Sequence, residues 1–61
     1  MQTKSQIANE MMRGCPADSR ADHEAVAAAL VRGDDAAAIL KMAELDRWPE
    51  TYVWLKSELA A

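Results

Sequence analysis

The chain has 61 residues and a formal net charge of −3. This length allows one domain at most, spanning residues 1–61, and a core of this size rarely contributes more than about 3–5 kcal/mol of stability. Cys15 is the only cysteine, which excludes an intrachain disulfide, and with one histidine it supplies too few ligands for a closed zinc site. We therefore expect no cofactor, and stabilisation by self-association, by a partner or by a well-packed helical core.

The apolar segments of the chain indicate its location in the cell. No stretch approaches the roughly 18 apolar residues of a membrane span, and residues 1–15 lack the apolar core of a signal peptide. The sequence thus predicts a soluble, cytoplasmic protein.

Residues 1–33 are electrically balanced, whereas residues 34–61 carry three basic and six acidic side chains, so the whole negative excess lies in the second half.

The composition predicts an all-α fold, a compact bundle of three to four short helices. Alanine is the commonest residue, and leucine, methionine, glutamate, lysine and arginine add further strong helix formers. β-branched residues are scattered and never alternate as they would in a strand. We expect helices two to four to form the core, with the first helix covering one side.

The first helix is expected between a capping box and a glycine. Thr3 and Gln6 have the spacing of an N-terminal capping box. The helix should then run to about Arg13, and Gly14 should end it. Its apolar side chains fall on one side, namely Ile7, Ala8, Met11 and Met12.

The second helix is expected over residues 20–32. Asp18 or Ser19 would cap it, and Ser19 with Asp22 matches a second capping box. Gly33 should close its C-terminus. The face predicted to turn inward consists of Ala25, Val26, Ala29 and Leu30.

The last two helices are expected on either side of a bend at residues 47–49. Asp34 and Asp35 suit the positive N-terminus of the third helix, and Pro49 suits the first position of the fourth. The spacing i, i+3, i+4, i+7 predicts an inward stripe on the third helix, made of Ala36, Ile39, Leu40 and Ala43. On the fourth helix the shared face consists of Tyr52, Leu55 and Leu59.

Residues 36–55 resemble the DNA-binding helix-turn-helix family, which includes small phage regulators and packaging proteins. The likeness lies in the helix AAAILKMAEL followed, after a short bend, by ETYVWLK. It implies a dimer that reads a palindromic site, with contacts from Arg47, Thr51, Tyr52, Lys56 and Ser57. The family usually has a glycine in the turn, which is absent here, and the acidic charge of this half opposes phosphate binding. Direct nucleic-acid binding is therefore the alternative reading.

Two tryptophans and a set of carboxylates favour protein binding. Trp54 lies away from Tyr52 on its helix, and it is either covered by the first helix or exposed as an anchor for another chain. Tryptophan is enriched among interface hot spots, and Trp48 raises the same question. The carboxylates predicted to ring this anchor are Asp34, Asp35, Glu44, Asp46 and Glu50.

No catalytic site is expected. Cys15 and His23 could form a catalytic dyad only with an orienting group and a cleft, and His23-Glu24 does not begin a zinc-protease motif because residue 27 is alanine. A reduced, structural thiol and a partly buried or surface histidine are the simpler interpretations.

These observations favour a non-enzymatic protein-binding module that acts as an inhibitor or adaptor. Its partner would present a basic surface, as nucleic-acid-handling proteins do, and complementary charge would speed association. In its small size and acidity the chain resembles phage- and plasmid-encoded inhibitors of host systems, anti-CRISPR proteins among them. The alternatives are the helix-turn-helix regulator and a structural subunit that assembles with itself, and a homodimer is compatible with each reading.

Overall fold

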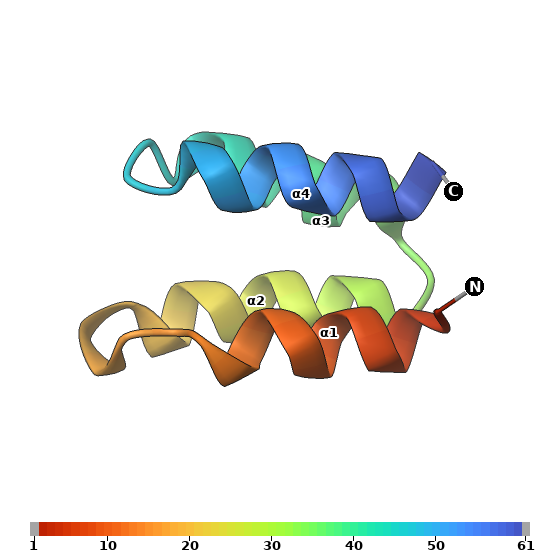
Figure 1. Cartoon of the computed structure of the whole chain (residues 1–61), viewed down its shortest axis with the longest axis horizontal. Helices are drawn as coiled ribbons and strands as arrows, with labels where there is room; N and C mark the ends of the chain where they lie inside the picture. The colour runs from red at the N-terminus through yellow and green to blue at the C-terminus, as the bar shows by residue number, and fades with distance from the viewer. Residues whose placement is uncertain (1, 61) are drawn as a thin grey trace.

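The computed structural model describes residues 2–60 and contains four α-helices. They are α1 (Lys4–Arg13), α2 (Arg20–Val31), α3 (Asp35–Glu44) and α4 (Pro49–Ala60), and a 3-10 turn, η1 (Ala17–Ser19), precedes α2. Figure 1 shows two layers, α1 beside α2 and α3 beside α4. The α2–α3 connection lies at one end of the bundle, and the other two connections lie at the opposite end. The all-α prediction is confirmed, and no helix in residues 2–60 is both long and apolar enough to cross a membrane.

The first capping box is present and the second is not. The Gln6 amide donates to Thr3 Oγ1 at 3.1 Å, and the Thr3 amide donates to Gln6 Oε1 at 2.8 Å. Ser19 stands at the N-cap of α2, but its side chain makes no capping bond. Its hydroxyl instead donates to the Pro16 carbonyl at 3.4 Å. The prediction of a Ser19–Asp22 box was wrong, because η1 leads directly into α2 and turns this hydroxyl back toward the loop.

A left-handed glycine joins the two layers. Gly33 has a φ of +85°, which residues with a Cβ rarely adopt. Its amide donates to the Leu30 carbonyl at 3.0 Å, and the Asp34 amide donates to the Ala29 carbonyl at 2.9 Å. These bonds form a Schellman motif. Asp34 then caps α3, because its Oδ1 accepts the Ala37 amide at 3.1 Å. The predicted end of α2 and start of α3 are therefore confirmed.

The core draws on all four helices. Its buried apolar residues are Ile7, Ala8 and Met11 of α1, Val26, Ala29 and Leu30 of α2, Ala38 and Met42 of α3, and Leu55 of α4. The first helix is thus a full member of the core rather than a cover on one side. Ala25, expected on the inner face of α2, is exposed, and the buried His23 shares that face instead.

The α3 helix is rotated from its predicted orientation. Its buried residues are Ala38 and Met42, whereas Leu40 is 63% exposed. The predicted inward stripe therefore faces largely outward, with Ala36 and Ala43 exposed and Ile39 half-buried. Alanine and larger apolar residues occur on several sides of this short helix, so its sequence contains two overlapping apolar stripes. Packing buries the stripe that contains Met42.

Candidate functional site: the tryptophan cleft

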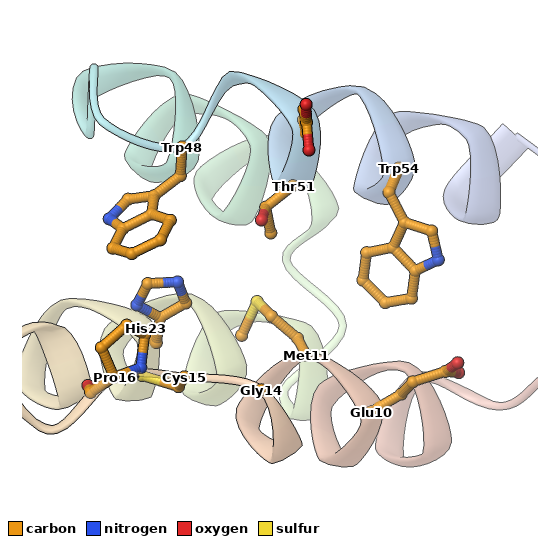
Figure 2. Close-up of a pocket in the computed structure, with 10 residues that line it drawn as sticks. Glu10, Met11, Gly14, Cys15, Pro16, His23, Trp48, Thr51 and Trp54 are labelled. Atoms are coloured by element: carbon orange, nitrogen blue, oxygen red, sulfur yellow. Dashed lines mark hydrogen bonds between the residues drawn. The ribbon is translucent and has the colours of Figure 1, made fainter.

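A cleft of about 260 Å³ opens where the first part of α4 faces the end of α1. We call it the tryptophan cleft. Figure 2 shows the Trp48 and Trp54 rings and Thr51 pointing from the α4 side toward α1 and α2. The lining residues are Glu10, Met11, Gly14, Cys15, Pro16, His23, Trp48, Glu50, Thr51 and Trp54. The cleft therefore combines α1 and the loop after it with His23 of α2 and with residues 48–54, which are distant in the sequence.

His23 positions Trp48 at one end of the cleft. The His23 side chain is buried, and its Nδ1 lies 2.9 Å from the Ser19 carbonyl oxygen. Because a carbonyl only accepts, Nδ1 carries the proton. The His23 and Trp48 rings meet edge to face, with centroids 5.3 Å apart and planes at 77°, an arrangement that aromatic rings favour. Trp48 is thus held half-buried by the neighbouring layer.

Arg47 also packs against this tryptophan. Its guanidinium carbon lies 5.6 Å from the centre of the Trp48 ring, within the range of a cation–π contact. The same guanidinium lies 3.4 Å from Oδ2 of Asp18, a residue of η1. This pair is well exposed, and such pairs contribute at most about 1 kcal/mol. Its main effect is to connect the α3–α4 turn to the loop before α2.

Trp54 forms the other aromatic wall. The side chain is half-buried and packs against the core, and it lines the cleft together with Glu10 and Met11 of α1. The sequence left open whether the first helix covers this tryptophan or leaves it exposed. In the structure this side chain is half-buried, and Figure 2 shows its ring pointing toward α1.

The predicted acidic ring is not a single surface. Asp34 and Asp35 lie at the start of α3, and Trp48 lies beyond its other end, so about 15 Å of helix separates them. Asp34 caps α3 and lies 3.8 Å from Arg32, and Asp35 pairs with Lys4 at 2.6 Å. These two carboxylates therefore have structural partners away from the cleft.

The remaining predicted carboxylates lie nearer the tryptophans. Glu44 ends α3, and Asp46 lies in the turn before Trp48; both are exposed. Glu50 is exposed in the first turn of α4 and lines the tryptophan cleft. Glu10 of α1 lines it as well, although sequence reasoning did not identify it. No local signal marks Glu10, because the contact depends on α1 packing near α4.

The residues proposed for DNA contact do not form one exposed face. Thr51 is half-buried in the cleft. Tyr52 is half-buried, and Lys56 Nζ lies 5.1 Å from the centre of its ring. Arg47 contacts Trp48 and Asp18 as described above, and Ser57 is exposed.

The paired helices also differ from a helix-turn-helix in their arrangement. In Figure 1, α3 and α4 run in opposite directions along the same axis of the molecule, whereas helix-turn-helix pairs cross at roughly 90–120°. This part of the chain is an antiparallel helical hairpin.

The remaining candidates for catalysis or metal binding are Cys15 and His23. Cys15 Sγ lies 3.3 Å from the Pro16 carbonyl oxygen and 4.0 Å from Ser19 Oγ, so the hydrogen bonds described for this thiol do not join it to His23. Within residues 2–60, no group of three or more His, Cys, Asp or Glu side chains is placed to hold a metal ion. No protein-family model, curated protein or solved structure matches the chain.

Proposed function

We propose that this protein is a small non-enzymatic binding module that acts as an inhibitor or adaptor. It would dock the tryptophan cleft on a basic surface of a nucleic-acid-handling protein. The acidic rim of the cleft, formed by Glu10 and Glu50, would face that surface. The observation that supports this proposal is the cleft itself, in which two half-buried tryptophans lie beside two exposed glutamates.

The aromatic walls supply the binding energy in this proposal. Interface hot spots are enriched in tryptophan and lie in well-packed pockets from which water is excluded. Trp48 and Trp54 are held by packing before a partner arrives, so little side-chain entropy would be lost on binding.

The acidic rim supplies the selectivity. Glu10 and Glu50 carry negative charge at the edge of the cleft, and the Gln2 amide that donates to Glu10 at 2.7 Å does not neutralise it. Such a rim favours basic partners and raises the association rate. A partner surface occupied in this way would no longer be free to bind DNA or RNA.

The proposal extends to the setting in which the protein acts. We place it in the cytoplasm, where the free thiol of Cys15 would stay reduced. The combination of small size, acidity and inhibition is typical of phage- and plasmid-encoded proteins that act against host systems, including anti-CRISPR proteins. A homodimer would leave the mechanism unchanged if the tryptophan cleft remained open.

Affinity capture with matched variants tests the proposed function. The immobilised protein should retain a basic, nucleic-acid-binding partner, and Trp54→Ala or the double variant Glu10→Gln/Glu50→Gln should lose it. Glu24→Gln is the control, because Glu24 is exposed on α2 and does not line the cleft. The captured protein should also bind less nucleic acid when wild-type protein is added. Equal capture by wild type and both cleft variants would refute the proposal.

A further inference from the structure

The carboxylates of Glu10 and Glu50 give the lining of the tryptophan cleft an acidic character. No lysine or arginine is among the lining residues. Glu10 and Glu50 only accept hydrogen bonds when ionised. Thr51 adds a hydroxyl that can accept. The cleft therefore suits a ligand that donates several hydrogen bonds and carries positive charge.

The size of the cleft indicates how much of a ligand it accepts. Small-molecule sites usually measure about 300–1,000 Å³, and this cleft, at about 260 Å³, lies just below that range. It is also shallow enough that Glu10, Gly14, Pro16 and Glu50 remain exposed. A single side chain from a partner surface fits these dimensions better than a complete cofactor does.

The walls favour arginine over lysine. Trp48, Trp54 and Met11 make most of the inner surface apolar. A guanidinium group is planar, stacks on aromatic faces and is less strongly hydrated than an ammonium group. It therefore loses less hydration free energy on entering such a site. Its several N–H donors also match the carboxylate and hydroxyl acceptors around it.

We propose that the tryptophan cleft binds one arginine side chain of the partner, with the guanidinium against one of the two indole walls and its charge attracted by Glu10 and Glu50. This inference rests on the proposed function and names the group that the cleft recognises. The partner surface would then contain an arginine that projects far enough to enter the cleft.

NMR titration of the full chain tests the assignment with defined probes. N-acetyl-arginine amide should shift the indole N–H signals of Trp48 and Trp54 and the backbone amide of Thr51. N-acetyl-citrulline amide, which has the same shape without the charge, and N-acetyl-lysine amide should bind at least about threefold more weakly. Citrulline binding as tight as arginine binding, or indole signals that do not move, would overturn the assignment.

Variants test whether the acidic rim contributes to binding of the arginine amide. Glu10→Gln/Glu50→Gln should weaken arginine amide binding by about three- to tenfold, the range expected for two exposed ion pairs. Glu24→Gln should leave it unchanged, and an equal effect of both variants would contradict the assignment.

If arginine amide fails to bind while the rim variant still loses its captured partner, the arginine assignment falls and the proposed function stands. If arginine amide binds at the cleft but cleft variants capture partners normally, the assignment stands and the proposed function falls.

Discussion

Two leucines that differ in burial give a direct test of the packing. Leu55 of α4 is fully buried in the core, whereas Leu40 of α3 is 63% exposed. Truncating a buried leucine to alanine costs about 2–5 kcal/mol. A domain of 61 residues has a total stability of about 3–9 kcal/mol at the usual 0.05–0.15 kcal/mol per residue. At the middle of these two ranges, about 3.5 of 6 kcal/mol, Leu55→Ala should remove more than half of the stability.

Leu40→Ala should behave differently. Full burial of a leucine side chain is worth about 1.5–3 kcal/mol, and only about a third of Leu40 is covered. The loss should thus stay below about 1 kcal/mol, and the higher helix propensity of alanine should offset part of it.

Urea unfolding followed by circular dichroism and tryptophan fluorescence measures both changes. Leu40→Ala should cost less free energy of unfolding than Leu55→Ala, and an equal cost would contradict this packing. Leu40 would then be buried, either because α3 has the orientation expected from its sequence or because a second copy covers this face. Repeating the measurement at several protein concentrations separates these cases, since only a dimer gives a midpoint that rises with concentration.

The connections and caps give three further predictions, each measured as a change in the free energy of unfolding. Gly33→Ala should cost about 1–2 kcal/mol because Gly33 has a φ of +85°. Gly14→Ala should be neutral or stabilise the fold by up to about 1 kcal/mol, since Gly14 has a φ of −98° and open space around its Cα. Equal effects of the two substitutions would contradict the assigned turns. Asp34→Ala should cost about 1 kcal/mol and Asp34→Asn much less, because asparagine also caps helices; a full loss with asparagine would show that charge matters more than the cap. A double-mutant cycle with Lys4→Ala and Asp35→Ala should give a coupling of at most about 1 kcal/mol, because both side chains of this ion pair are about 40% exposed, and a coupling several times larger would indicate a buried pair.

Helix boundaries were predictable because their signals are local. Thr3 with Gln6, Gly33 with Asp34, and Pro49 act within one turn of a helix, and each functions in the structure at its predicted position. Ser19 is the exception, since its hydroxyl bonds to the Pro16 carbonyl rather than capping α2.

The orientation of α3 was not predictable from periodicity. Residues 36, 39, 40 and 43 form one apolar stripe, and residues 38, 42 and 45 form another that overlaps it. The choice between them depends on how the other helices pack. In the folded chain Met42 fills the interior and the small side chain of Ala38 is fully buried beside it, while Leu40 remains outside.

The candidate site was predictable only in its aromatic part. Trp48, Trp54 and Glu50 were identified from their residue types and positions, and all three line the cleft. Asp34 and Asp35 were grouped with them because they are acidic residues of the same half of the chain. However, they begin α3, and the length of this helix places them at the other end of the bundle. Glu10 and His23 join the cleft only through contacts between layers, which no sequence spacing within one helix reveals.

Site-specific photo-crosslinking tests most directly whether the tryptophan cleft is the docking surface. Gly14 lies at its exposed rim with open space for a side chain, so a photoreactive amino acid can replace it without disturbing the core. The control position is Leu40, which is exposed and does not line the cleft. If the tryptophan cleft is the docking surface, position 14 should crosslink to a basic protein at a peptide containing arginine, and the crosslinks should be lost in the Glu10→Gln/Glu50→Gln background. Crosslinks from position 40 with none from position 14 would instead assign binding to the outer face of α3 and exclude the cleft.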